Sequence, residues 1–295
     1  MAHGLHTFLK DHPMIDRLWI IKKDQWKKPA YFKETLQEIS ELALGMRRER
    51  YDLAVDLSGL LRSGLMAMAS GAAVKLGFEE SDEGSPLFYT HKIKGGMDIH
   101  AVDRYLKLAR TLGCHTWETK YPLAPYDPAP GICSGLPSRY VVISPSAGKP
   151  ANQWPAEKFG ELASMLPIKS VVISSPSDKP VAEKVAHHSG GRAISIGGRT
   201  SLKELIPVIQ GASCMVTNDT GPMHLAAALD VPVYAIFGPA NPVRTGPRGN
   251  IHKVIQKNMD CRPCYAWKPC SHWRCMNDIT VQDVLDVMPD FKNFI

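Results

Sequence analysis

The chain has 295 residues, of which 44% are hydrophobic and 22% charged, and its formal net charge is +6. This composition is typical of a folded globular protein and excludes an intrinsically disordered one. The sequence has no apolar run of about 18 residues, so we expect no membrane-spanning helix. The first residues, MAHGLHTFLKDHP, lack the charged-then-apolar pattern of a signal peptide, which predicts a cytoplasmic protein.

Two basic clusters lie in the first fifty residues. One, Lys22–Lys28, contains Trp26, and the other is Arg47–Arg50. Basic residues beside a Trp suit the surface of an anionic membrane or an anionic lipid-linked acceptor, whereas two solvated basic edges are the alternative. A moderate net charge of this kind does not indicate nucleic-acid binding. We therefore expect no nucleic-acid partner, and both a peripheral contact with an anionic membrane surface and two solvated basic edges stay open.

Helical and strand patterns alternate through the first half of the chain. This alternation predicts a parallel sheet covered by helices on both faces. The expected elements are a helix end at Leu5–Lys10, a short strand at Arg17–Ile21, a long helix at Pro29–Arg50, a buried strand at Asp52–Leu57, a strand at Val74–Phe78 and a helix at Ile99–Leu112.

Residues 116–138 are rich in Pro and Gly and show little periodicity, which is typical of a domain boundary. We therefore expect one domain at residues 1–125, a linker at 126–138 and a second domain at 139–295.

The second half has a more regular pattern. The expected strands and helices alternate as in a Rossmann-like nucleotide-binding domain. They are strands at Tyr140–Ser144, Ser170–Ser174, Ala193–Ile196, Cys214–Thr217 and Val231–Phe237, and helices at Pro155–Leu166, Lys179–His188, Ser201–Gln210 and Val281–Val287.

One turn in this half has the features of a phosphate site. A strand ends at Asn218–Asp219, and a helix begins near Thr220-Gly221-Pro222. The free N–H groups and the positive end of the helix dipole at such a turn attract an anion, and Gly221 lets it approach the backbone. His224, in the first helical turn, adds a hydrogen-bonding or cationic side chain. An ordinary capped turn is the alternative.

A second loop has a similar character. The strand Tyr140–Ser144 continues into Pro145-Ser146-Ala147-Gly148-Lys149, and a helix follows at Pro155. Small residues with open N–H groups, one cation and a helix N-terminus favour phosphate binding here as well.

The longest motif, DTGPMHLAAAL followed by PVYAIFGPANP, closely resembles the nucleotide-sugar-binding signature of glycosyltransferase family 9, the ADP-heptose:lipopolysaccharide heptosyltransferases. The cysteine-containing tail is similar to that of heptosyltransferase II. This resemblance implies an α/β fold of the GT-B class, with two Rossmann-like doubly wound domains facing across a cleft. It also implies an inverting, metal-independent transfer of heptose from ADP-heptose, or a related nucleotide sugar, to a lipid-linked lipopolysaccharide core acceptor, without a cofactor.

The resemblance also implies which residues bind the two substrates. The donor-binding candidates are Ser146, Gly148, Lys149, Asn152, Asp219, Thr220, Gly221 and His224. The family has a Lys two residues before Trp154, where this chain has Asn152, so Lys149 is the substitute cation. The segment DLSGLLRS resembles D-x-Q-G-L-x-[KR]-S, with Ser58 where the family usually has Gln, and this resemblance places Arg62 and Ser63 on the acceptor side.

The catalytic base is not assigned by this resemblance. The segment DHPMIDRLW is similar to an internal part of the family, and the usual opening strand and its G-D loop, which carries the family's base, have no counterpart here. Asp56 is a weak candidate, and a structural carboxylate at a strand end is the preferred interpretation. A doubly wound sheet without its first strand is expected to leave large apolar surfaces exposed.

Three other functions stay open at this point. One is a nucleotide-sugar-binding remnant without transfer activity, and the second is an enzyme of the same architecture, such as a nucleotide-sugar epimerase. The third, a zinc-dependent nucleic-acid binder, depends on four cysteines within fifteen residues, Cys261, Cys264, Cys270 and Cys275. These cysteines fit a reduced packed loop, a structural metal site or, least well, a disulfide.

Overall fold

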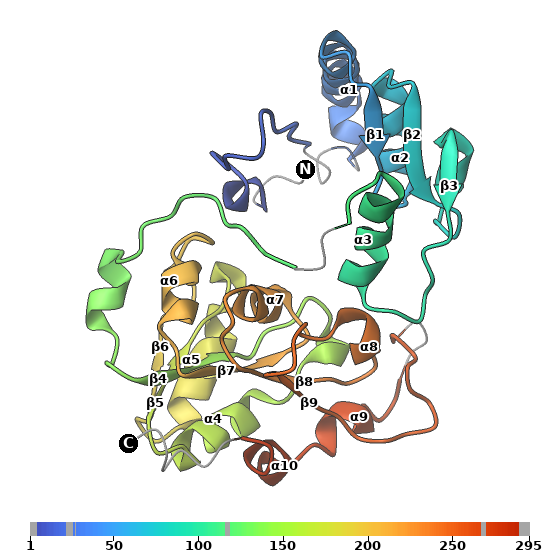
Figure 1. Cartoon of the computed structure of the whole chain (residues 1–295). Coiled ribbons are helices and arrows are strands. Elements are labelled where there is room, and N and C mark those ends of the chain that lie inside the picture. The colour runs from blue at the N-terminus through green and yellow to red at the C-terminus, as the bar shows by residue number, and fades with distance from the viewer. Residues whose placement is uncertain (1–4, 22–25, 27, 116–118, 267–269, 289–295) are drawn as a thin grey trace. The chain divides into compact units, whose positions relative to one another are not determined.

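The computed structural model describes residues 5–21, 26, 28–115, 119–266 and 270–288. The chain divides into two compact units, residues 1–119 and 120–295, and each is described by itself. Within the described residues, each unit is built on one parallel sheet with helices beside it (Figure 1). No helix of the described chain combines the length and the apolar character that crossing a bilayer requires.

The first unit contains a sheet of order β1-β2-β3, in which both pairs are parallel. Its core gathers around β2, where Leu76 and Phe78 pack with Leu108 of α3. The elements are 3-10 helices at Leu5–Phe8, Pro29–Tyr31 and Ser85–Phe88, helices α1 (Phe32–Arg48), α2 (Leu61–Ala69) and α3 (Ala101–Thr111), and strands β1 (Leu53–Val55), β2 (Val74–Phe78) and β3 (His91–Ile93).

The strand predicted at Arg17–Ile21 is wrong. This segment is irregular, with a single bridge at Ile21. Side chains hold it instead of a strand ladder: the Trp19 indole N–H donates to the Tyr51 hydroxyl at 2.9 Å, and its ring lies against Gly45.

The prediction of a buried strand at Asp52–Leu57 needs a second correction. Strand β1 is shorter, and Leu53 and Val55 are 37% and 39% exposed. Among the described residues β1 pairs only with β2, so one of its sides has no neighbouring strand. Leu65 and Met68 of α2 are also exposed. Exposed apolar side chains are thus present on both β1 and α2, and the larger apolar surface expected from the sequence stays a prediction.

The second unit contains a parallel sheet of order β6-β5-β4-β7-β8-β9. Numbered along this unit, the order is 3-2-1-4-5-6, the order of the Rossmann fold, and it reverses between β4 and β7. The strands are β4 (Tyr140–Ser144), β5 (Lys169–Val172), β6 (Ala193–Ser195), β7 (Cys214–Asn218), β8 (Val233–Ile236) and β9 (Lys253–Ile255).

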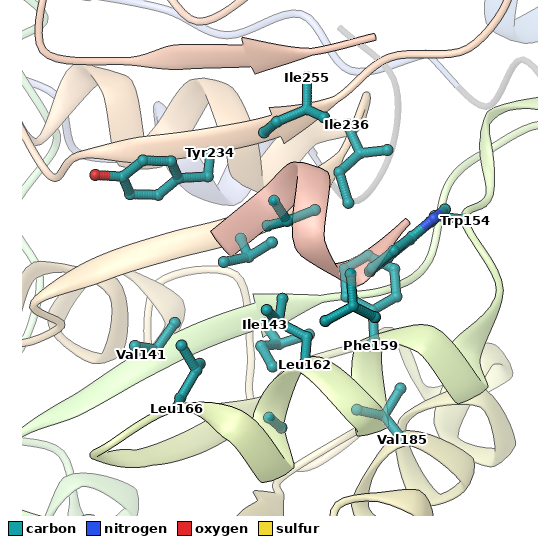
Figure 2. Close-up of a cluster of buried hydrophobic side chains, with 14 of the residues drawn as sticks. Val141, Ile143, Trp154, Phe159, Leu162, Leu166, Val185, Tyr234, Ile236 and Ile255 are labelled. Atoms are coloured by element: carbon teal, nitrogen blue, oxygen red, sulfur yellow. The ribbon is translucent and has the colours of Figure 1, made fainter. Parts of the chain in front are cut away.

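Helices cover both faces of this sheet, so the residues of the strands β4, β7 and β8 are all buried. On one face, Val141 and Ile143 pack with Phe159 and Leu162 of α4, as Figure 2 shows. On the other face, strand residues pack with α6 and α7. The helices are α4 (Ala156–Met165), α5 (Lys179–His188), α6 (Leu205–Gln210), α7 (Gly221–Ala228), α8 (Pro242–Thr245), α9 (Arg274–Asn277) and α10 (Val281–Leu285).

Residues 126–138, predicted as a linker, belong to this second unit. They contain a 3-10 helix at Gly131–Gly135. Three of their side chains pack against the hydrophobic core of the second unit, those of Ile132, Cys133 and Leu136. Strand β9 was not predicted, because three residues within a Gly- and Pro-rich stretch give too short a pattern to detect.

Candidate functional site

The site lies where the order of the six-stranded sheet reverses. Strands β4 and β7 are neighbours, with Ser144 opposite Thr217 at their carboxyl ends. The loop after β4 and the turn after β7 therefore leave the same edge of the sheet side by side. In doubly wound sheets, ligands bind in the crevice at this switch point. The donor-binding candidates predicted from the sequence come from these two segments and the start of α7.

The turn after β7 leads directly into helix α7. Thr220 has an extended backbone (φ −153°, ψ 166°) and makes no side-chain cap. The N–H groups of Thr220 and Gly221 have no acceptor among the described residues, and Pro222 has no N–H. Helix α7 thus begins with unsatisfied donors and the positive end of its dipole. This is an anion-binding arrangement.

Two glycines of the site have open space beside their backbone. A Cβ placed on Gly148 or on Gly221 meets no atom within 4 Å. Neither glycine has a positive φ, so neither local backbone conformation requires glycine. Gly160, by contrast, is packed so closely that a Cβ would lie 2.4 Å from His188. The space at Gly148 and Gly221 lets a ligand reach the main chain.

Ser146 contributes a buried hydroxyl. It is 8% exposed, and its Oγ has no hydrogen-bond partner among the described residues. A buried polar atom without a partner costs about 1–3 kcal/mol, so such atoms in native proteins call for an explanation. A ligand oxygen in the switch-point crevice would supply the missing partner.

Asn218, the last residue of β7, connects the two segments. It is fully buried; its Nδ2 donates to the Pro145 carbonyl at 2.6 Å, and its Oδ1 accepts from the Trp154 N–H at 3.1 Å. No role was predicted for Asn218 from the sequence, although its place at the end of an apolar strand and directly before Asp219 is a signal for one.

Asp219 is the acidic side chain of the site. Burial raises the pKa of its carboxyl group above the ordinary value. The Asn152 amide donates to its Oδ2 at 3.4 Å, and no Lys or Arg ion pair with Asp219 is present in the described part of the chain. Because Asn152 is neutral, this contact leaves the charge of the Asp219 carboxylate unbalanced.

The cationic candidates lie at the exposed margin. Lys149 is exposed, and its Nζ is 3.5 Å from the Tyr265 carbonyl, a distance that makes a weak hydrogen bond at best. His224 is exposed in the first turn of α7.

The acceptor-side candidates belong to the first unit. The carboxylate of Asp56 accepts from the N–H groups of Ser58 (2.8 Å) and Gly59 (3.1 Å) and from the Tyr89 hydroxyl (2.7 Å). With both oxygens engaged, it has the geometry of a structural carboxylate that fixes the turn after β1. Ser63 exchanges hydrogen bonds with the backbone of Leu60 at the start of α2, and Arg62 is exposed beside it.

The seven cysteines are all unpaired, and Cys275 is buried. Across the described ranges, no three His, Cys, Asp or Glu side chains are arranged to hold a metal ion. The cysteine-containing segment does adjoin the sheet edge: the N–H groups of Cys264 and Tyr265 donate to the Pro239 carbonyl at 3.1 and 2.9 Å.

The solved structures similar to this chain establish its fold. Escherichia coli heptosyltransferase WaaC with ADP has a TM-score of 0.75 at 24% identity, covering 97% of this chain and 87% of WaaC. A glycosyltransferase family 9 protein from Veillonella parvula has a TM-score of 0.79 at 21% identity, covering 97% and 85%. The predicted α/β fold with Rossmann-like units, as in the GT-B class, is thus confirmed.

Two curated relatives match most of the chain, and another matches a shorter part of it at higher identity. The lipopolysaccharide core heptosyltransferase OpsX of Haemophilus influenzae is 25% identical, over 83% of this chain and 76% of its own length. Lipopolysaccharide heptosyltransferase 1 of Escherichia coli is 28% identical over 83% and 79%. Lipooligosaccharide heptosyltransferase 2 of Haemophilus ducreyi is 36% identical, over 36% of this chain and 33% of its own length.

The family model described as glycosyltransferase family 9 (heptosyltransferase) matches residues 39–272, which include β4, β7, α7 and every donor-binding candidate. The chain therefore belongs to glycosyltransferase family 9, the heptosyltransferases, and is a glycosyltransferase.

Proposed function

We propose that this protein transfers heptose from ADP-heptose to the core of lipopolysaccharide, with inversion at the sugar and without a metal ion. Family membership supports the reaction class, and relatives named lipopolysaccharide core heptosyltransferases support the sugar and the acceptor. A solved family structure whose fold this chain shares contains ADP. The second unit would bind the donor, and the first would meet the acceptor.

The observation that carries the proposal is the convergence of unsatisfied donors at the ends of β4 and β7. The N–H groups of Thr220 and Gly221 and the buried hydroxyl of Ser146 lack acceptors among the described residues. A diphosphate supplies acceptor oxygens for all three. When the bond to the sugar breaks, negative charge grows on this diphosphate, and fixed N–H donors and the α7 dipole stabilise it.

Charge at the site constrains how the diphosphate binds. Asp219 is negative when ionised, and Asn152 does not neutralise it. We propose that Lys149 leaves its weak contact with the Tyr265 carbonyl and pairs with a phosphate oxygen, while His224 contacts the diphosphate from α7. Asp219 would bind a hydroxyl of the donor, because a carboxylate accepts from hydroxyls and repels phosphate.

The acceptor would be held by the first unit. Exposed Arg62 at the start of α2 is suited to an anionic group of a lipid-linked acceptor. We propose that the protein works in the cytoplasm, at the inner membrane surface. An inverting transfer requires a base for the attacking hydroxyl. We leave that base unassigned, because Asp56 already uses both carboxylate oxygens.

The first test is calorimetric titration of ADP and of UDP into the purified protein, followed by incubation with ADP-heptose and a lipopolysaccharide core acceptor. We expect saturable ADP binding and the release of one ADP for each heptose transferred. Nucleotide release without an acceptor would instead favour a different enzyme class. Absence of nucleotide binding by the folded protein would overturn the donor site.

A glycine variant makes the test specific to the site. Gly221→Ala places a Cβ where the free protein has open space, so it should weaken ADP binding without a clash in the fold. Gly131→Ala is the matched control, because a Cβ there also meets nothing within 4 Å and the residue lies outside the site.

A further inference from the structure

Asn218 occupies a central place in the donor half of the molecule. It ends β7, is 0% exposed, and immediately precedes Asp219. We propose that Asn218 is a positioning residue: its side-chain amide holds both ends of the loop Pro145–Trp154 against the end of β7. The proposal rests on the proposed function, because this loop contains four of the residues assigned to the donor.

The hydrogen bonds of Asn218 have one consistent orientation. Its Nδ2 faces a carbonyl, that of Pro145 at 2.6 Å, and its Oδ1 faces an N–H, that of Trp154 at 3.1 Å. Rotating the amide by half a turn would place oxygen against oxygen and nitrogen against N–H. The Pro145 carbonyl needs a donor and the backbone N–H of Trp154 needs an acceptor. A side-chain amide suits this position because it is neutral and carries a donor and an acceptor on opposite sides.

The pinned loop brings two parts of the site together. Ser146 directly follows Pro145, and Asn152 lies two residues before Trp154, and both Pro145 and Trp154 are hydrogen-bonded to Asn218. Asn152 then reaches Asp219 across the crevice. Through one side chain, the end of β7 fixes both the loop that carries Ser146 and the turn that carries Asp219.

Removing the amide would leave the fold's elements in place but release the loop. The strand pairs of β4 and β7 are formed by backbone groups and do not involve this side chain. The Pro145 carbonyl and the Trp154 N–H would lose their buried partners, so the loop would move to satisfy them. Ligand binding would then require the loop to be ordered again, which lowers affinity.

The test compares Asn218→Ala with Tyr140→Phe. Tyr140 is buried at the other end of β4, and its hydroxyl donates one hydrogen bond to the Val208 carbonyl at 2.8 Å. Both variants lose buried hydrogen bonds of the same unit, but only the first touches the donor loop. We expect the ADP dissociation constant to rise about tenfold or more in Asn218→Ala and less than about twofold in Tyr140→Phe.

The outcomes separate this proposal from the function. If the unaltered protein does not bind ADP, the donor site itself is wrong. If it binds ADP, and folded Asn218→Ala binds it within about twofold as tightly, the positioning role is overturned. A purely structural Asn218 would lower the melting temperature without changing the affinity of the folded protein.

A measurement on the unaltered protein covers the case in which Asn218→Ala does not fold. Hydrogen exchange without ligand should show the Trp154 amide protected to the same degree as amides of β7, because both are bonded in the buried interior. Rapid exchange of Trp154, at the rate of exposed loop amides, would overturn the proposal.

Discussion

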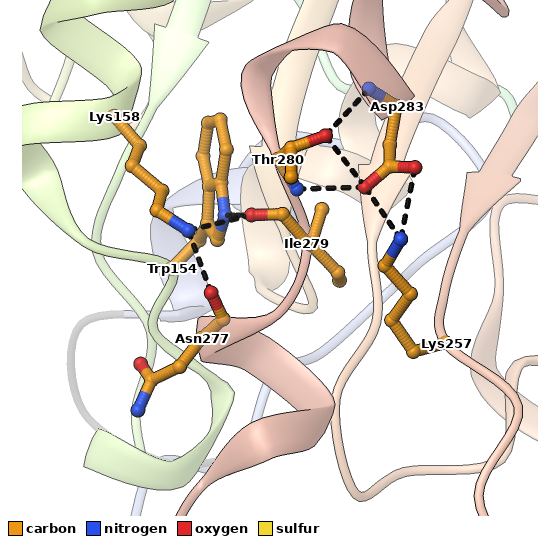
Figure 3. A network of polar contacts seen from close by, with 7 residues as sticks. All are labelled: Trp154, Lys158, Lys257, Asn277, Ile279, Thr280 and Asp283. Carbon is orange, nitrogen blue, oxygen red and sulfur yellow. Dashed lines mark hydrogen bonds and ion pairs between the residues drawn. The ribbon is translucent and has the colours of Figure 1, made fainter.

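The indole Nε1 of Trp154 donates to the carbonyl of Ile279 at 2.9 Å, across 125 residues of sequence (Figure 3). The same carbonyl accepts from Lys158 Nζ at 2.7 Å, and Lys158 also reaches the Asn277 carbonyl at 2.6 Å. The backbone N–H of Trp154 donates to Asn218. Trp154 therefore connects the loop Pro145–Trp154 to the segment that contains Asn277 and Ile279. The carbonyls of Asn277 and Ile279 therefore help to hold the loop that we propose for the donor.

Replacing Trp154 should therefore affect both stability and binding. Trp154→Phe removes the bond to Ile279 and leaves a cavity beside Phe159, whose ring meets the indole edge-on at a centroid distance of 4.8 Å. We expect the free energy of unfolding to fall by about 2–4 kcal/mol and ADP affinity to fall with it. Urea denaturation measures the first effect and calorimetry the second.

Trp19→Phe is the control for this substitution. It also removes an indole N–H bond, to the Tyr51 hydroxyl, but in an exposed setting in the first unit. We expect a smaller loss of about 1 kcal/mol and unchanged ADP affinity. Equal losses for the two variants would show that Trp154 has no special supporting role.

Asp283 fixes the same segment from its other side. Lys257, at 2.8 Å, and the Thr280 N–H lower the pKa of Asp283 to about 2. Its carboxylate also completes the capping box of α10. A carboxyl group with a lowered pKa stabilises the protein above its unfolded pKa of about 4, and this contribution is lost as the pH falls toward 2.

Asp283→Asn should accordingly reduce stability at pH 7 by about 1 kcal/mol, with a smaller difference from the unaltered protein at each step from pH 4 to pH 2. Thermal unfolding across this pH range measures the effect. Asp286, the C-cap residue of the same helix, is bonded only to Gln282 among the described residues, and Asp286→Asn should change stability by less than about 0.5 kcal/mol. A pH-independent loss in Asp283→Asn would contradict the ion-pair explanation.

The second unit could be predicted largely from sequence because its signals are local and agree with one another. The apolar strands around Val141 and Val216, and the capping box in which Ser201 and Glu204 exchange hydrogen bonds, are visible as patterns. The structure shortens the helix after that box to Leu205–Gln210. The start of α7 after Thr220 was also predictable, since helix starts have a distinct composition.

The remaining features depend on contacts between distant residues. No local pattern shows that Asn218 reaches both Pro145 and Trp154, because 73 and 64 residues separate them. The exposure of Leu53 and Val55 was hidden as well, since the apolar sequence of a short strand does not show whether the faces of its sheet are covered by other elements. The cluster of cysteines likewise fitted a packed loop, a metal site or a disulfide, and its spacing alone could not decide among the three.

A substitution of Asp219 should change the stability of the protein and its donor binding in opposite directions. Burial raises the pKa of its carboxyl group, so the ionised form is disfavoured in the folded protein. A carboxyl group with a raised pKa favours folding at low pH, and this advantage is lost as the pH rises from the unfolded pKa of about 4 through the folded pKa. The unaltered protein should thus lose stability over that range.

Asp219→Asn removes the buried charge while keeping the size of the side chain. We expect it to be more stable than the unaltered protein at pH 7, with a difference that grows as the pH rises above 4 and then levels off. The same variant should bind ADP-heptose more weakly than the unaltered protein if Asp219 accepts from a donor hydroxyl.

Melting temperatures between pH 4 and pH 8, with calorimetry at pH 7, test both parts. A variant that is less stable at pH 7 would show that the carboxylate has a favourable partner in the folded protein, and one that is more stable with unchanged affinity would remove Asp219 from the donor site.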